Sequence, residues 1–274
     1  MKKLLAKIKA FIRKIFGSAV ADIIVPVATV KKWDECTKSS NWWGKNAAHR
    51  AMNALSPKFS DSKFKEYIKF QKDRGCNYVN LFVTNKGDGE GAGYSIWGTT
   101  PFAGSVKNDT AKMMVKRMEY CRDQGFGIFA WLLADDSTAW NKTILSKPDQ
   151  FAKDLKDGGF LDDGLISGVV LGLEMEEYCN VNQANALYKA IKSRWKGKIG
   201  THSVSDKFSF AAFGDVVFLQ VNPGTDKNKI CNFVNNVAAK TGKKICMFEM
   251  EREPDNSKSK YVLEHSKAFS VGNW

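Results

Sequence analysis

Residues 169–177 read VVLGLEMEE, and residues 244–251 read KICMFEME. Each stretch runs from apolar residues directly into acids. A short, continuous apolar run is typical of a strand that is buried on both faces, as the strands of a parallel sheet are. The two stretches therefore predict parallel strands that carry carboxylates at their C-terminal ends.

Strands and helices are predicted to alternate from residue 50 onward. Apolar runs predict eight strands, at residues 50–55, 78–84, 127–133, 168–174, 198–202, 216–221, 244–249 and 269–272. Apolar spacing and capping residues predict helices at about 61–74, 109–124, 148–156, 181–195, 227–240 and 256–265, and no eighth outer helix is predicted. Together with the length of 274 residues, this alternation favours one α/β domain, a (β/α)8 TIM barrel. Such a barrel keeps its chemistry at the C-terminal ends of its strands.

An open, doubly wound parallel sheet is the competing fold. Its signature is a glycine-rich turn with GxGxxG spacing directly after the first strand. In this chain the glycine-rich segment, residues 85–104, follows the second predicted strand and lacks that spacing. The closed barrel is therefore the favoured architecture.

The first 17 residues form a separate basic segment. They carry six lysine or arginine residues and no acid, and their apolar residues recur at helical spacing until Gly17. This pattern predicts a basic amphipathic arm, followed by an extended linker over residues 18–44 and the barrel domain over residues 45–274. The basic residues interrupt the apolar core that a secretion signal needs, although residues 19–21 resemble a cleavage site. We expect the arm to dock on a protein partner or a membrane surface.

The charge of the chain restricts its partners. The formal net charge is +13, but the arm carries six of these charges and leaves a surplus of only +7 on the rest of the chain. Because this surplus is mild, we expect no nucleic-acid partner. No apolar run approaches the roughly 18 residues of a membrane-spanning helix, so the chain is not expected to be transmembrane.

The cysteines do not suggest a metal site. Six cysteines form no CxxC pair, and three histidines are too few for an obvious zinc site. Cys76, Cys121 and Cys246 lie in apolar context and are expected to be buried free thiols. Free thiols favour synthesis in a reducing cytoplasm, with later release or association with a virion left open. We expect neither a metal nor another cofactor.

Polar and aromatic side chains gather at the predicted strand ends. Ten acids fall on this edge, and crowded carboxylates raise one another's pKa values, which folding alone does not require. The candidate catalytic residues are Glu174, Glu177 and Glu249. The candidate substrate-binding residues are Asn85, Trp131, Asp135, His202, Gln220 and Trp274. For Trp131 and His202, roles in core packing remain equally open.

In two segments the chain resembles the retaining (β/α)8 glycoside hydrolases, the cellulase-like clan. Residues 243–249 (KKICMFE) match the clan's strand-7 pattern and put Glu249 at the position of the nucleophile. Residues 169–177 match the strand-4 pattern and put Glu177 at the position of the acid/base. Glu176 then replaces an Asn that, in the clan, normally contacts the sugar 2-hydroxyl. The other register makes Glu174 the acid, and the choice between the two stays open.

The resemblance implies a hydrolase that cuts a polysaccharide or a cell-envelope glycan with two carboxylates. The alternative is a barrel that binds carbohydrate without cutting it, or a structural protein built on the same scaffold. Residues 50–85 and the loop at 88–90 are also similar to barrel proteins encoded among bacteriophage structural genes. That second similarity would fit a virion protein with a docked N-terminal arm.

Overall fold

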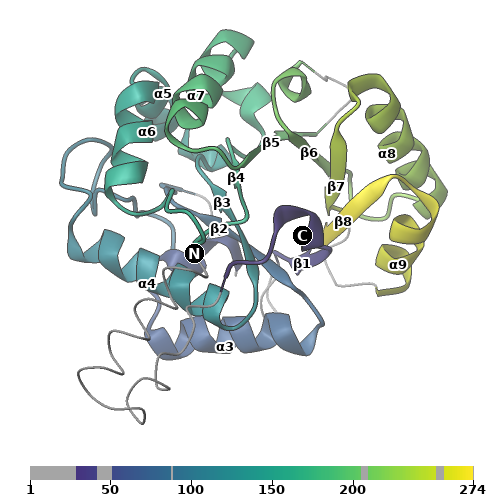
Figure 1. Cartoon of the computed structure of the whole chain (residues 1–274), viewed down its shortest axis with the longest axis horizontal. Helices are drawn as coiled ribbons and strands as arrows, with labels where there is room; N and C mark the ends of the chain where they lie inside the picture. Colours follow the sequence, from purple (N-terminus) through teal and green to yellow (C-terminus); the bar gives the residue numbers. More distant parts are fainter. Residues whose placement is uncertain (1–28, 42–50, 88, 205–208, 251–255, 274) are drawn as a thin grey trace, which may run out of the picture.

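The structure is a computed structural model, and it describes residues 29–41, 51–87, 89–204, 209–250 and 256–273. Its centre is an eight-stranded sheet in which every pair of neighbouring strands is parallel. The strands are β1 (Lys38–Ser40), β2 (Tyr78–Phe82), β3 (Gly127–Trp131), β4 (Gly168–Val170), β5 (Lys198–Ser203), β6 (Val216–Gln220), β7 (Lys244–Glu249) and β8 (Ala268–Asn273). Their order, β1-β8-β7-β6-β5-β4-β3-β2, forms a nearly closed ring with the helices outside it (Figure 1). The predicted α/β barrel is confirmed.

The outer helices lie where the capping signals predict them. They are α3 (Asp61–Asp73), α4 (Asp109–Asp123), α6 (Pro148–Asp157), α7 (Val181–Arg194), α8 (Lys227–Thr241) and α9 (Asn256–His265). Short 3-10 turns are η1 (Trp33–Glu35), η2 (Ala51–Leu55), η3 (Asp135–Ser137), η4 (Met175–Glu177) and η5 (Phe210–Ala212). The sequence prediction missed α5 (Thr138–Leu145). That helix is only eight residues long and contains threonine and asparagine, which are weak helix formers.

The prediction of a first strand at residues 50–55 is wrong. Residues 51–55 form the 3-10 turn η2, and the first barrel strand is β1, which lies inside the segment predicted as a linker. The sequence of β1 is Lys-Ser-Ser, which has no apolar pattern to reveal it. Amide side chains supply the hydrogen-bond partners of its two buried serines instead. Asn80 donates to Ser39 Oγ at 3.0 Å, and Gln71 bonds both the N–H and the C=O of Ser40.

An asparagine closes the ring between β1 and β2. The backbone N–H of Asn77 donates to the carbonyl of Lys38 at 2.9 Å. The side-chain oxygen of Asn77 accepts from the N–H groups of Thr37 and Lys38, at 2.9 and 3.1 Å. This single residue therefore does at the seam what a hydrogen-bond ladder does between the other strands.

Aromatic side chains fill the barrel interior. Trp131 is 0% exposed, stacks on Phe248 with ring centroids 4.3 Å apart, and meets Phe218 edge-on at 5.4 Å. Phe129 and Tyr78 continue the cluster. Burying each such side chain stabilises the fold by about 1.5–3 kcal/mol. The interior is thus a packed floor, and the polar strand ends lie above it.

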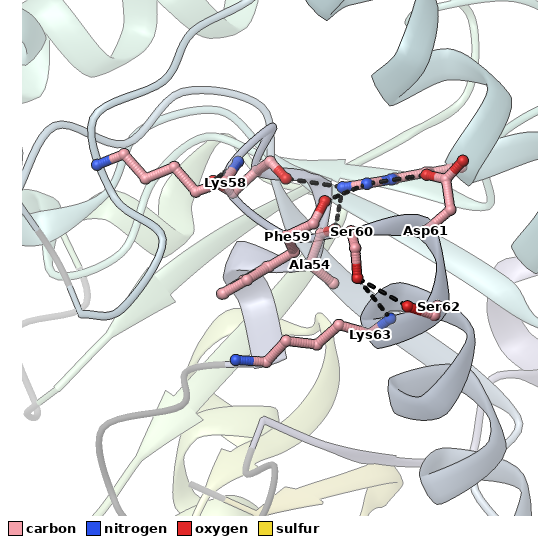
Figure 2. A network of polar contacts seen from close by, with 9 residues as sticks. Ala54, Lys58, Phe59, Ser60, Asp61, Ser62 and Lys63 are labelled. Atoms are coloured by element: carbon pink, nitrogen blue, oxygen red, sulfur yellow. Dashed lines mark hydrogen bonds and ion pairs between the residues drawn. The ribbon is translucent and has the colours of Figure 1, made fainter.

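A buried arginine fixes the turn η2 to the barrel wall. Arg117 of α4 donates to the carbonyls of Ala54, Ser56 and Phe59 and to the carboxylate of Asp61. Figure 2 shows three of these acceptor residues, Ala54, Phe59 and Asp61, close together in one network of polar contacts. Because the carbonyls belong to a loop, the arginine replaces the backbone ladder that this segment lacks.

All six cysteines are free thiols, and five are buried, including the three for which burial is predicted. None of the helices in the described part of the chain has the length and apolar character that a bilayer-spanning helix needs. The predicted N-terminal arm and Trp274 lie outside the described residues.

Candidate active site

The end of β4 is a turn with an unusual backbone. The strand stops at Val170, earlier than predicted, and Glu174 then adopts a left-handed conformation with φ 45° and ψ 43°. Only Phe102 shares a positive φ among the described non-glycine residues. Such a conformation costs on the order of 1–3 kcal/mol and tends to occur at functional sites. It places three acids in quick succession at the rim of the barrel.

His202, at the end of β5, holds this turn. Its Nδ1 accepts the backbone N–H of Glu174 at 3.1 Å, which assigns the ring proton to Nε2. The ring is 0% exposed, and burial lowers the pKa of His202 to about 3, so the side chain is neutral. Its Nε2 is buried without a hydrogen-bond partner in the described part of the chain. The ring lies edge-on to Trp131 and Phe248 and holds a neutral, buried N–H donor.

A bulge in β7 decides where Glu249 points. Leu219 of β6 pairs with Met247, but the next residue, Gln220, pairs with Glu249, so Phe248 is an extra residue in β7. Met247 packs in the outer cluster against the helices, whereas Phe248 packs in the barrel interior. Strict alternation would send Glu249 outward with Met247. The bulge instead makes Glu249 the neighbour of Gln220 on the inner side. Bulges beside active sites often redirect a side chain in this way.

Gln220 connects the two acid-tipped strands. A side-chain hydrogen bond from Gln220 reaches the carboxyl group of Glu174. Glu249, which is 5% exposed, is the register partner of Gln220 on the adjacent strand. The Oε1 of Gln220 is a buried acceptor without a partner in the described part of the chain. Gln220 thus interacts with an acid after β4 and pairs in register with an acid of β7.

The carboxyl of Glu174 favours its protonated form. Burial raises its pKa above the ordinary value of 4.5. The hydrogen bond from Gln220 acts in the opposite direction, while the charges of Asp135 and Glu177 raise the pKa further. Side-chain contact with Glu177 raises the pKa of Glu174 as well. Glu174 is half-buried, and Glu177 is exposed.

The third acid of the turn is held by β5. Ser203 donates from Oγ to Glu176 Oε1 at 3.1 Å. Tyr178, which sequence reasoning missed, supports the turn from inside by donating to the carbonyl of Leu173 at 2.8 Å. Burial raises the pKa of Tyr178 well above its ordinary range, and the charges of Asp135, Glu176 and Glu174 add to the effect. Three carboxylates therefore surround a single tyrosine. No sequence motif points to Tyr178, since a tyrosine after an acid run is ordinary.

Two predicted binding residues have other partners. Trp131 lies within the aromatic core and donates from Nε1 to Asn80 Oδ1 at 2.9 Å, so it offers no exposed ring face. Asn85 is also fully buried, and it donates to Asn53 and accepts from Ser137. The structure places Asp135, His202 and Gln220 around Glu174 and Glu177, and it pairs Glu249 in register with Gln220. Trp131 and Asn85 belong to other clusters. In the described part of the chain, no three His, Cys, Asp or Glu side chains are placed to hold a metal ion.

Solved structures with the same fold are glycoside hydrolases. A GH113 β-1,4-mannanase is 13% identical, with 90% of this chain and 88% of the other covered and a TM-score of 0.55. An endo-1,4-β-mannanase from Eisenia fetida is 12% identical, with 87% of this chain and 84% of the other covered and a TM-score of 0.57. Endo-glycoceramidase II from Rhodococcus sp. is 10% identical, with 90% of this chain and 75% of the other covered and a TM-score of 0.60.

This chain has a barrel similar in fold to those of these glycoside hydrolases. At these identities the likeness concerns the fold alone. No protein-family model and no curated protein sequence matches the chain.

Proposed function

We propose that this protein is a retaining glycoside hydrolase that cuts a polysaccharide or a cell-envelope glycan. The observation that supports the proposal is that Gln220 pairs in register with Glu249 of β7 and also interacts with Glu174 in the turn after β4. Two carboxyl groups with different environments are what the reaction needs: one ionised to attack and one protonated to release the leaving group.

In this scheme Glu249 is the nucleophile. Its carboxylate attacks the anomeric carbon of the sugar while a carboxylic acid donates its proton to the departing glycosidic oxygen. A covalent glycosyl-enzyme ester forms and the aglycone leaves. Water then attacks the anomeric carbon, gives its proton to the same acid residue, now a carboxylate, and frees Glu249. Both groups return to their starting states.

Glu177 is the proton donor in the proposal. It is the exposed member of the pair, so a glycosidic oxygen can approach it from solvent, whereas Glu174 is half-buried and its backbone is fixed by His202. Glu174 is then a positioning residue beside the proton donor.

The stereochemistry of the product tests the mechanism. The wild-type protein is incubated with soluble β-glycan oligomers, including manno-, gluco- and amino-sugar series, and the anomer formed first is read by proton NMR. We expect hydrolysis with the β-anomer released first, since retention requires two displacements. Release of the α-anomer first would contradict the retaining scheme and indicate a single displacement by water. Equal hydrolysis by a Glu249→Gln variant would remove Glu249 from the reaction.

The second candidate is a barrel that binds a glycan or serves as a virion or assembly scaffold without cutting. Glu176 favours it, because this acid stands where the resembling clan has an asparagine that contacts the substrate. The same incubation separates the two functions. Binding of an oligomer by the wild-type chain with no product after prolonged incubation would support the scaffold.

The N-terminal arm is a separate proposal, namely that it anchors the barrel to a protein partner or a membrane surface. It rests on the basic, amphipathic pattern of residues 1–17. Removal of residues 2–17 should abolish co-sedimentation with anionic vesicles or with the partner assembly and leave hydrolysis intact. Unchanged sedimentation would refute the anchoring role.

A further inference from the structure

The end of the barrel at which the strands begin is rich in lysine. Because every strand is parallel to its neighbours, all eight strands begin at one end, which we call the basal face. Lysines occupy the first position of β1, β5 and β7 or directly precede β7 and β8: Lys38, Lys198, Lys244, Lys243 and Lys267. A helix dipole favours basic residues in the last turn of a helix, but a sheet has only a small net dipole, so these strand positions need another explanation.

A cleft of about 420 Å³ opens on the basal face beside the starts of β4 and β5. Four lysines and two acids line it: Lys31, Lys32, Lys196, Lys198, Asp34 and Asp163. Trp33 of η1 is partly exposed among them. Nζ of Lys198 lies 5.6 Å from the centroid of the Trp33 ring, and Phe269 of β8 meets the same ring edge-on at 5.3 Å. The turn η1 therefore crosses the basal face from β5 to β8 and presents an indole beside the lysines.

Most acids at this end are already paired with basic residues. Those at the last turns of the helices or in the loops before the strands form ion pairs: Asp73, Asp123, Asp157, Asp162, Asp215 and Glu264. Lys196, Lys244 and Lys267 are exposed, and none of the three has an ion pair within the described ranges of the chain. The basal face thus presents surplus positive charge to solvent, whereas the acids around Glu174 lie at the opposite end of the barrel.

The chain enters the barrel at this cleft. Lys31 and Lys32 lead directly into η1, and Ser167, just before β4, donates from Oγ to the carbonyl of Lys31 at 2.6 Å. The basic segment of residues 1–17 is joined to the basal face through residues 18–28. A basic amphipathic segment is typical of chains that lie on an anionic lipid surface, and tryptophan beside lysine is common where protein meets lipid headgroups. The charge and the aromatic group of the basal face therefore fit the same surface as the arm.

We propose that the basal face docks on an anionic lipid bilayer, with lipid phosphates bound by the lysines of the cleft and Trp33 at the headgroup level. This inference deepens the proposed anchoring by residues 1–17, and it rests on that anchoring for the choice of lipid over another polyanion. An anionic surface attracts the basal face and repels the acidic end, so the charge distribution also sets the orientation. The strand ends that carry the acids then face away from the membrane.

Co-sedimentation with vesicles measures the docking. The full chain is mixed with vesicles of phosphatidylcholine and phosphatidylglycerol, and separately with vesicles of phosphatidylcholine alone. The variant Lys196→Gln/Lys244→Gln/Lys267→Gln removes three exposed charges from the basal face. Since one lysine near an anionic surface contributes about a fivefold gain in binding, we expect this variant to bind the anionic vesicles about 10- to 100-fold more weakly than the wild type. The difference should vanish on phosphatidylcholine alone.

The variant Lys65→Gln/Lys112→Gln/Lys116→Gln is the matched control. It removes three exposed charges as well, but from the groove between α3 and α4 on the outer wall of the barrel. We expect its binding to fall by less than about threefold, because salt screens charges that lie more than about 10 Å from the lipid. An equal loss in both triple variants would indicate a general effect of net charge and would overturn the docking role of the basal face. Unchanged binding of the basal variant would overturn it too.

Lysine acetylation, measured by mass spectrometry, tests the orientation. Anionic vesicles should protect Lys196, Lys244 and Lys267 of the wild type and leave Lys112 and Lys116 reactive. Protection of Lys112 and Lys116 with a reactive basal face would overturn the proposed orientation. Tighter binding of the wild type to double-stranded DNA or to an anionic glycan than to the anionic vesicles would overturn lipid as the partner.

The arm, the basal face and the hydrolase can fail separately. Loss of sedimentation on removal of residues 2–17, with a basal variant that binds like the wild type, would overturn this inference and keep the arm. Loss of binding in the basal variant alone would support the inference and refute anchoring by the arm. Hydrolysis of soluble oligomers should be equal in the wild type and the basal variant, because the substituted lysines lie at the other end of the barrel. Absence of hydrolysis in both would overturn the hydrolase and leave the docking results unaffected.

Discussion

The two halves of the barrel mouth use their polar side chains in different ways. On the β2–β3 side, Asn53, Asn85 and Ser137 bond to one another, and Asn80 bonds both Ser39 and the ring of Trp131. Two atoms on that side, Asn41 Nδ2 and Asn141 Oδ1, are buried without a partner in the described part of the chain. On the β4–β7 side, such unsatisfied atoms accompany a strained turn. Glu174 has a left-handed backbone, and His202 and Gln220 each leave a buried atom without a partner in the described part of the chain.

The difference separates polar residues that build the fold from those that await a ligand. A buried network in which the members satisfy one another stabilises a single arrangement of the loops. Strain and unpaired atoms cost stability, so they persist where something other than stability retains them. The half of the mouth that is the less favourable for folding is thus the half that is suited to chemistry.

The largest expected effect is on the β4–β7 side. Glu249→Gln should lower kcat by about 10³-fold or more, because an amide cannot act as the nucleophile. The melting temperature should change little, since glutamine fits the same space. Hydrolysis rates and thermal unfolding are measured on the same preparation, with Glu66→Gln as the control. A loss of activity that follows a loss of folded protein would make Glu249 a structural residue.

The two acids of the turn should differ in their effect. Glu177→Gln should lower kcat by about 10²- to 10³-fold for substrates with poor leaving groups and much less for an activated aryl glycoside, which needs no proton. Glu174→Gln should lower kcat less, and to a similar extent for both kinds of substrate, because in the proposal Glu174 does not donate the proton. The kcat values of both variants on the two kinds of substrate check this. The opposite ranking would assign the acid to Glu174.

On the β2–β3 side the expected effect is on stability. Trp131→Phe removes the indole N–H, so the buried Oδ1 of Asn80 loses this hydrogen-bond donor. The free energy of unfolding should fall by about 1–3 kcal/mol. The KM of the folded fraction should be unchanged, since the ring is fully buried. Urea unfolding and steady-state kinetics measure the two quantities. A large rise in KM without a loss of stability would restore Trp131 as a substrate platform.

The smallest expected effect is a pH-dependent gain in the stability of the Glu174→Gln variant. The pKa of Glu174 is higher in the folded than in the unfolded state, so the folded state binds more protons between the two values. Stability contributed by this group is therefore present below about pH 4.5, the unfolded value, and is lost as the pH rises through the folded one. Glu174→Gln should be more stable than the wild type at pH 7 by less than about 1 kcal/mol, since solvent screens a half-buried group.

Urea unfolding at several pH values provides the measurement. The gain should disappear below pH 4.5, where the wild-type carboxyl is also neutral. A gain that is independent of pH would reflect repacking rather than charge. Asp162→Asn, which removes an exposed acid beside Lys156, serves as the control.

The sequence by itself determines the barrel and the two strands that carry its acids. Continuous apolar runs give the buried strands, and capping residues such as Ser60 give the helix starts, because both signals are local. The prediction of strand β7 is correct to the residue, Lys244–Glu249. It fails for β1, whose serines are buried only because Gln71 and Asn80 meet them.

The tertiary structure alone decides what the acids and rings do. The bulge at Phe248 arises from the pairing of β7 with β6, and it turns Glu249 to the inner face against the alternation of its own strand. Trp131 becomes core because Phe248 stacks on it, and Glu174 gains its raised pKa from burial and from residues on other strands. Direction, burial and pKa depend on neighbours that are distant in the chain, and no local pattern of residues encodes them.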